Sequence, residues 1–246
     1  MTSGMKALVA GTLVAVVTIG GEVAYLYHRN HPADVPLKKA EYKNDPDNEV
    51  FIKSEHPSTF ADAKAMKGRA LWVSAGGQMD YYPYTGHAVD YRHSQGVLLG
   101  AEKILVQDAV EQVAPKQAAF RIPQGDKQVL FVFTKPDDPA SAGKEFAVPV
   151  GFRQAGDYTF STDQIFLYDD PHKLFAYWGP NVWKAIDEHR AIVGMNERQV
   201  QTALGQVSDP HGDTIGERTV VYDNQGKPKR VVFSGGKAIK VEEVAQ

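Results

Sequence analysis

The sequence predicts an α+β protein with an N-terminal transmembrane helix, a β-rich middle domain and a C-terminal ααβββ module of two helices and three strands. Three observations lead to this fold class. An apolar segment lies near the N-terminus, short β-type runs separated by turn residues follow it, and helical spacing and then alternating strands complete the chain. The expected domains are an anchor (1–27), an extended linker (28–58), a β-rich domain (59–170) and the C-terminal module (171–246).

Composition excludes several classes of function. The chain has 246 residues and no cysteine, which excludes disulfides, thiol catalysis, Cys-ligated zinc and a lipidated N-terminal cysteine. Its 27 basic and 30 acidic residues give a formal net charge of −3. A nucleic-acid-binding domain is expected to present a basic face, so we expect no nucleic-acid partner.

The anchor is expected at residues 7–27, which carry one charged side chain, Glu22. A membrane-spanning helix needs about 20 apolar residues, whereas the apolar core of a secretory signal has about 7–15. A cleavage site ending at Ala24 would also place Glu22 at its −3 position. We therefore expect a retained single-pass membrane helix, with a cleaved signal as the alternative.

Small residues in this helix indicate where a partner helix could pack. Gly11 and Ala15, and likewise Gly20 and Ala24, are four residues apart, a spacing that lets helices approach closely in lipid, although both types are common in membrane helices. Glu22 is either a polar contact to such a helix or a side chain that reaches interfacial water. The expected partners are therefore the bilayer and an integral membrane protein complex.

Residues 28–58 are polar, contain four prolines and show no apolar period, which is typical of a tether. The isolated apolar residues 50–52 would suit a strand added to a partner. Alternation within residues 101–114 favours a strand over a helix there. The β-type runs that predict a small mixed or barrel-like domain are 69–74, 103–110, 128–134, 145–152 and 164–169.

The C-terminal module opens with an expected helix that has Asn181 as its cap. Helical spacing is shown by Trp183, Ile186, Arg190 and Val193. Three strands are expected in "ERTVVYD", "KRVVFSG" and "KAIKVEE", joined by the turns "NQGK" and "SGGK".

The stretch "GMNERQVQTALG" (194–205) predicts a short, sharply bounded helix. Asn196 is the expected N-cap and Gln199 its capping-box partner, while Met195 and Val200 form a hydrophobic staple. The other assignments are a buried stripe at Val200, Ala203 and Leu204, a left-handed helix end at Gly205, a helix break at Gly194, and solvent-facing side chains at Glu197 and Arg198.

This pattern of "GM", Glu, Val and "LG" resembles the SmpA/OmlA module, which is the module of the outer-membrane assembly lipoprotein BamE. The hairpin "KRVVFSGGKAIKVEE" is similar to that module's ending, and the resemblance covers roughly residues 182–244. Two features depart from the family: no N-terminal cysteine is present, and the proline after "LG" is delayed to Pro210. The resemblance implies scaffolding in the bacterial envelope on the periplasmic side, whereas the basic residues after the anchor would alone favour the cytoplasm.

No catalytic, cofactor-binding or metal-binding residue is predicted. The chain lacks the sequence motifs of α/β-hydrolases, HExxH metalloproteases, P-loops and dinucleotide-binding folds. His172 and His211 each stand in a "DPH" turn beside carboxylates, so a His/Asp metal site is the alternative. His189 is expected to be partly buried and hydrogen-bonded. A second alternative is a loose metal site at His87, Asp90 and His93.

Two dense aromatic clusters are either core residues or partner contacts, because Tyr and Trp are enriched at protein interfaces. The second cluster is expected to join the two domains into one rigid body. The candidate partner contacts of the first cluster are Tyr81, Tyr82, Tyr84 and Tyr91, and the second cluster consists of Phe175, Tyr177, Trp178 and Trp183.

The expected function is that of a non-enzymatic, membrane-anchored accessory subunit or assembly scaffold of a larger membrane complex. It would act through protein–protein contacts on the periplasmic side, where the anchor raises its effective concentration for a resident partner. One alternative is a membrane-tethered enzyme or metal-binding protein that uses His172 or His211. The other is an exported ligand-binding protein behind a cleaved signal.

Overall fold

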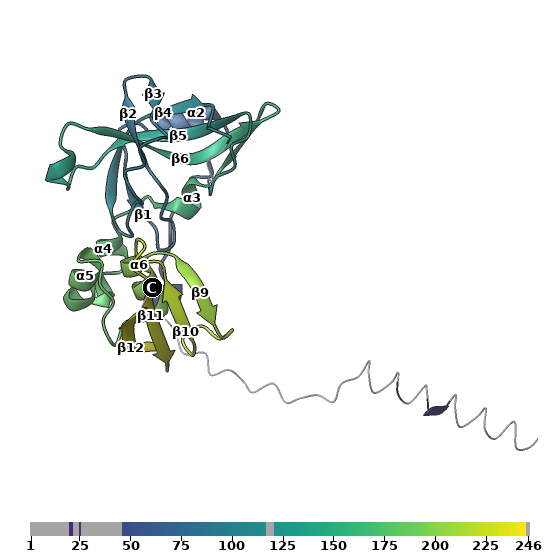
Figure 1. The fold of residues 1–246 in the computed structure, drawn as a ribbon, viewed down its shortest axis with the longest axis vertical. Coiled ribbons are helices and arrows are strands. Elements are labelled where there is room, and N and C mark those ends of the chain that lie inside the picture. The colour runs from purple at the N-terminus through teal and green to yellow at the C-terminus, as the bar shows by residue number, and fades with distance from the viewer. Residues whose placement is uncertain (1–19, 22–24, 26–45, 117–120, 245–246) are drawn as a thin grey trace, which may run out of the picture. The chain divides into compact units, whose positions relative to one another are not determined.

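The structure is a computed structural model that describes residues 20–21, 25, 46–116 and 121–244. The chain divides into two compact units, residues 1–48 and 49–246. In the first unit the short 3-10 helix η1 (Pro46–Asn48) is described. The second unit holds two antiparallel sheets, named here the large sheet and the small sheet, together with short helices (Figure 1).

The predicted fold class and membrane localisation are wrong. In the described part of the chain, no helix has the length and apolar character needed to cross a membrane, and the two longest have eight residues each. The fold is instead β-rich, with two antiparallel sheets. Apart from residues 20, 21 and 25, the predicted span lies outside the described residues, and so do Gly11, Ala15, Glu22 and Ala24.

The large sheet has the strand order β3-β2-β6-β5-β4-β1-β8, and β7 pairs with β6 beside this path. All of these pairings are antiparallel. The expected strand at 164–169 is instead a helical turn followed by β8. The strands are β1 (Ala70–Val73), β2 (Tyr82–Thr85), β3 (Ala88–Val89), β4 (Lys103–Gln112), β5 (Lys127–Thr134), β6 (Glu145–Gln154), β7 (Asp157–Phe160) and β8 (Phe166–Leu167).

Both faces of the large sheet are covered, which explains the continuous apolar run of β5. Val129, Phe131 and Phe133 are buried in the main core on one face. Leu130, between them, is buried on the other face in a smaller core that includes Tyr82. A strand that is buried on both faces has no need to alternate apolar with polar residues.

Short helices connect the strands of the second unit. The helix α2 starts at a capping box, in which the Asp62 N–H donates to Thr59 Oγ1 at 3.2 Å and the Thr59 N–H donates to the Asp62 carboxylate at 2.8 Å. The helical segments before α5 are α2 (Phe60–Ala65), η2 (Pro139–Ser141), α3 (Thr162–Ile165), α4 (Pro171–Leu174) and η3 (Ala176–Trp178).

The helix α5 (Pro180–Asp187) is shorter than its sequence pattern predicts. It starts after Gly179 with no side-chain cap, so Asn181 is not its cap, because proline at the first helical position sets the start. It ends at Asp187, so Arg190 and Val193 lie beyond it. Gly194 does not terminate α5 either; its N–H donates to the Ala238 carbonyl at 2.8 Å.

The helix α6 (Glu197–Leu204) has the capping box that the sequence predicts. The Gln199 N–H donates to Asn196 Oδ1 at 2.9 Å, and the Asn196 N–H donates to Gln199 Oε1 at 2.8 Å. Met195, Val200 and Leu204 are buried. Gly205 ends the helix with φ 93° and ψ −146°, which is an extended conformation that glycine alone adopts readily rather than the expected left-handed helical one.

Two side chains of α6 that were expected to face solvent have partners. Glu197 forms an ion pair with Arg218 at 2.5 Å, and the two side chains are only 11% and 17% exposed. The Arg198 guanidinium lies 4.9 Å from the centre of the Phe175 ring. The expectation failed because a helix packed on two sides has little solvent face left.

The small sheet has the order β12-β11-β10-β9, so the predicted ααβββ module lacks one strand. The additional strand β9 was missed because its residues carry Pro210 and are mostly exposed, without apolar alternation. It lies at a sheet edge, where proline is tolerated. The strands are β9 (Val207–His211), β10 (Thr219–Tyr222), β11 (Lys229–Ser234) and β12 (Lys237–Glu243).

Residues 49–58, which the sequence assigned to the linker, belong to the second unit, although they form neither helix nor strand. Val50 and Ile52 pack against the core beneath the small sheet, and Phe51 between them is 85% exposed. The segment is therefore held by its own side chains rather than by backbone pairing.

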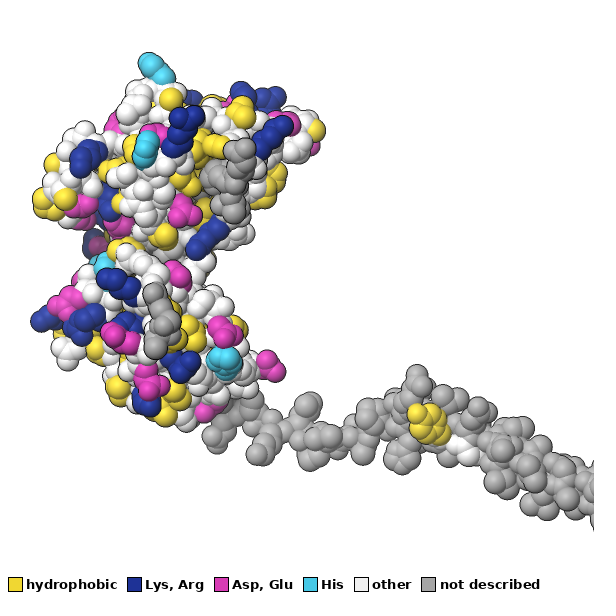
Figure 2. Space-filling view, viewed as in Figure 1, with side chains coloured by type: hydrophobic (Ala, Val, Ile, Leu, Met, Phe, Trp, Pro, Cys, Tyr) yellow, Lys and Arg dark blue, Asp and Glu magenta, His cyan; other side chains and the backbone are white. Residues whose placement is uncertain are grey.

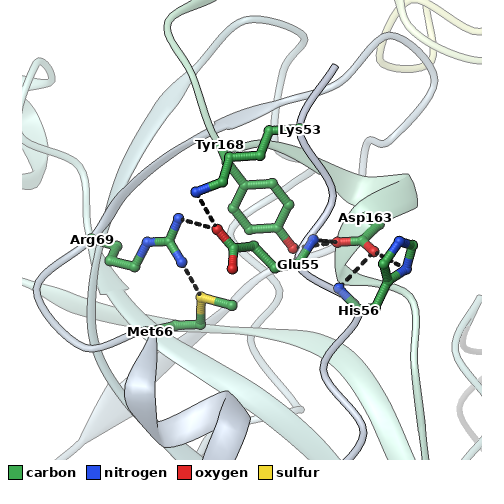
Figure 3. A network of polar contacts seen from close by, with 7 residues as sticks. All are labelled: Lys53, Glu55, His56, Met66, Arg69, Asp163 and Tyr168. Carbon is green, nitrogen blue, oxygen red and sulfur yellow. Dashed lines mark hydrogen bonds and ion pairs between the residues drawn. The ribbon is translucent and has the colours of Figure 1, made fainter. Parts of the chain in front are cut away.

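A polar network ties the end of this segment to the large sheet (Figure 3). The N–H groups of Glu55 and His56 donate to the Asp163 carboxylate at 3.1 and 3.0 Å. Arg69 donates to the Glu55 carboxylate at 2.8 Å, and this hydrogen bond, followed by that from Lys53, holds the pKa of Glu55 at about 2. The two contacts with Asp163 span more than 100 residues of sequence.

Candidate functional site

A cleft of about 460 Å³ lies where the large sheet meets the helices of the C-terminal half, and it is named here the junction cleft. Its wall combines β1, the turn before β4, the loop after β5, the start of α4 and the end of α5. Figure 2 shows charged and histidine side chains at the narrowing between the two halves of this unit. The cleft therefore brings together segments that are far apart in the sequence.

Negative charge is concentrated in the junction cleft. Two lysines face five carboxylates there, a formal net charge of −3, which leaves 25 basic and 25 acidic residues elsewhere in the chain. The whole negative excess of the protein therefore equals that of one cleft, and a recess lined by one sign of charge focuses the electric field. The charged residues are Lys103, Lys135, Glu102, Asp137, Asp138, Asp170 and Asp187.

Lys135 is largely neutralised by its neighbours. Its ammonium lies 2.5 Å from the Glu102 carboxylate and 3.7 Å from that of Asp138. Burial alone would lower the pKa of Lys135, but the hydrogen bond and charge of Glu102 outweigh it, so that the pKa is raised. The side chains of Lys135 and Glu102 are 12% and 18% exposed, so this pair is a fixed part of the wall.

His172 stands between two carboxylates on the opposite wall. Its Nδ1 is 3.2 Å from Asp170 and its Nε2 is 3.0 Å from Asp187. The imidazole also stacks on Trp183, with 4.1 Å between the ring centres. Asp170 caps α4 through the His172 N–H, so the helix start positions both side chains.

His189 lies at the edge of the cleft in an unusual state. Its Nδ1 is buried and has no hydrogen-bond partner in the described part of the chain, so the expectation of a hydrogen-bonded histidine is wrong. Burial lowers the pKa of His189, against the opposing charges of Glu102 and Asp187. The neutral imidazole is therefore favoured.

The first aromatic cluster lies mainly in the interior of the large sheet. Tyr81 and Tyr82 are 8% and 6% exposed, and Tyr84 packs on the smaller core. The Tyr91 ring packs at a tilt against Tyr82, with 5.1 Å between the ring centres, and its hydroxyl donates to Gln128 at 3.1 Å. Little of Tyr81 or Tyr82 is therefore left for a partner to touch.

The second aromatic cluster packs between the two halves. Phe175 stacks on Trp178 at 4.6 Å, and Trp178 stacks on Trp183 at 5.1 Å. The same core includes Trp72 and Leu167 from strands of the large sheet. Trp183 in turn stacks on His172, so this cluster packs against one wall of the junction cleft.

Two of the remaining histidine candidates form separate pairs. His211 lies 3.0 Å from Asp209, and His93 lies 2.6 Å from Asp90. Within residues 46–116 and 121–244, no group of three or more His, Asp or Glu side chains is placed to hold a metal ion.

Comparison with protein-family models, curated proteins and solved structures finds no match. The cleft must therefore be interpreted from its own geometry. The "DPH" turn marks His172 in the sequence as an alternative metal ligand, whereas no local pattern marks the Lys135–Glu102 pair, whose members are 33 residues apart and come from different strand ends. A search for charges at strand ends could have found the pair without showing that they meet.

Proposed function

We propose that this chain is a non-enzymatic binding subunit or scaffold that acts through contacts with another protein, and that a basic segment of that partner enters the junction cleft. One observation carries the proposal: the cleft contains a negative charge equal to that of the whole chain. Its volume of about 460 Å³ also lies within the range of about 300–1,000 Å³ that is common for binding sites.

The arrangement of charges favours a cationic guest. Lys135 is engaged by Glu102 and Asp138, so its charge does not offset the carboxylates of Asp137, Asp170 and Asp187. Asp187 keeps a side chain that is 53% exposed, and it can accept hydrogen bonds from a guest as well as from His172. A guanidinium offers five donors in a planar fork that matches carboxylates, so arginine side chains suit this wall best.

A rigid junction supports a scaffold role, because a preformed site loses little conformational entropy when a partner binds. The stacked Phe175, Trp178 and Trp183 rings provide that rigidity. The resemblance of residues 182–244 to the SmpA/OmlA module also supports a scaffold role, since that family works through protein contacts.

The proposal is tested by titrating the protein with an acetylated and amidated tetra-arginine peptide in an isothermal titration calorimeter. We expect binding that weakens as salt rises from about 50 to 500 mM, because the Debye length, beyond which exposed charges are screened, falls from about 14 to about 4 Å over this range. Tetra-glutamate should not bind. Equal behaviour of the two peptides would refute a cation-selective cleft.

Charge-neutralising variants locate the binding site. Asp187→Asn and Asp137→Asn should each weaken tetra-arginine binding about two- to fivefold, as expected for exposed ion pairs worth up to about 1 kcal/mol. Asp213→Asn removes the same charge from an exposed loop outside the cleft and should leave the affinity unchanged. A similar loss in all three variants would indicate only a general charge effect.

A further inference from the structure

His189 occupies a backbone position that favours glycine. Its φ is 51°, and it follows Glu188, the C-cap residue of α5. Its N–H donates to the Ile186 carbonyl and the Arg190 N–H donates to the Ala185 carbonyl, both at 2.8 Å, which is the pattern that closes a helix on a left-handed residue. A Cβ atom is unfavourable there because it crowds the neighbouring carbonyl oxygen, so histidine costs stability that glycine would not.

The environment of the His189 ring favours one tautomer. Nδ1 is buried without a partner among the described residues, whereas Nε2 is not among the buried atoms that lack a partner, and His189 lines the cleft. A buried N–H without a partner costs more than an unfilled acceptor, so the proton is placed on Nε2. His189 thereby presents a neutral N–H donor to a cleft that is otherwise rich in acceptors.

We infer that His189 is a ligand-contacting residue of the junction cleft and that its Nε2–H donates to a backbone carbonyl oxygen of the bound segment. This inference rests on the proposed function, because it names a second group, a backbone carbonyl, that the same site recognises besides positive charge. Carboxylates only accept hydrogen bonds and so cannot recognise a carbonyl. Of the two lysines, Lys135 is paired with Glu102 and Lys103 lies 5.8 Å over the Trp72 ring.

The inferred contact distinguishes a polypeptide from a polyamine. Both carry positive charges for the carboxylates, but only the polypeptide has carbonyl oxygens. His189 combines a strained backbone with a ring nitrogen that is unpaired among the described residues, and both features lower the stability of the protein. Such a residue is expected where selection favoured binding over stability. Replacement of His189 should therefore change stability and affinity in opposite directions.

The test compares His189→Gly with the wild-type protein, using tetra-arginine peptide and spermidine as probes. The variant should bind the peptide about three- to tenfold more weakly, the loss expected for one hydrogen bond, and spermidine with unchanged affinity. Its Tm should rise by about 1–4 °C because the left-handed residue becomes glycine.

Ala155→Gly is the matched control, since Ala155 also has a positive φ, 52°, and lies exposed in a turn outside the cleft. It should raise Tm similarly and change neither affinity. Unchanged peptide affinity in His189→Gly, or an equal loss for both probes, would overturn the carbonyl contact while leaving cation binding intact. If the wild-type protein binds neither probe, the proposed function and this inference both fail.

Discussion

The two sheets bury their side chains in different ways. The strand β5 of the large sheet is buried at six consecutive positions, because cores lie on both faces. In β11 of the small sheet, Val231 and Phe233 are buried, and the residues between and beside them are half-buried or exposed. Alternation of apolar and polar residues therefore identifies a strand only where one face of its sheet is exposed to solvent. It does not predict how the two sheets pack against each other.

The largest expected effects test whether the two sheets unfold together. Phe131→Ala in the large sheet and Phe233→Ala in the small sheet should each cost about 3–5 kcal/mol, because both rings are buried. Since the aromatic core joins the sheets, each variant should lower one shared transition in scanning calorimetry. Two separate transitions would show that the sheets are independent. Phe51→Ala, at an 85% exposed position, is the control and should change stability by less than about 0.5 kcal/mol.

A smaller pair of effects should have opposite signs in the two sheets. The Tyr168 hydroxyl, beside the large sheet, donates to Asp163 at 2.6 Å, so Tyr168→Phe should cost about 1.5–3 kcal/mol. The Tyr222 hydroxyl, in the small sheet, is buried with no partner among the described residues, so Tyr222→Phe should gain about 1–3 kcal/mol. Urea unfolding measures both, and a loss in Tyr222→Phe would reveal a partner for that hydroxyl.

Removing the N-cap of α6 or of α2 should change stability by a still smaller amount, and the two costs can be compared. Asn196→Ala and Thr59→Ala should each cost about 0.5–2 kcal/mol. We expect Asn196→Ala at the upper end, because α6 carries the fully buried Val200, whereas α2 lies near the surface with Ala63 as its buried residue. Hydrogen exchange of the first-turn amides measures the fraying directly. A larger cost at Thr59 would contradict this ranking.

The smallest effect concerns pH and the segment at residues 49–58. The pKa of Glu55 is about 2 in the folded protein, below its ordinary value of 4.5. The folded state thus binds fewer protons than the unfolded state, so this stabilisation is complete above about pH 4.5 and is lost as pH falls towards 2. Amide exchange at Glu55 and His56 should accelerate over that range. Glu55→Gln should remove the Glu55 contribution, and an unchanged pH profile in this variant would contradict the assignment.

Local sequence predicted those elements that depend on interactions between residues close together in the chain. The capping box of α6 depends on Asn196 and Gln199, which are three residues apart. By contrast, α5 ends at Asp187 although the apolar spacing continues to Val193. The spacing could not show that His189 would turn left-handed or that Gly194 would bond to β12.

The sequence by itself determined the capped helix α6, most strands of both sheets and the turns between the last three strands, because caps, turns and alternation act between near neighbours. Only the tertiary structure decided that Glu197 pairs with Arg218, that Arg69 and Asp163 hold residues 49–58, and that the junction cleft exists. Each of these depends on the tertiary fold, which brings residues from 14 to 108 positions apart within hydrogen-bond distance. A charged residue contributes to a binding site only when the fold brings the other residues of that site next to it.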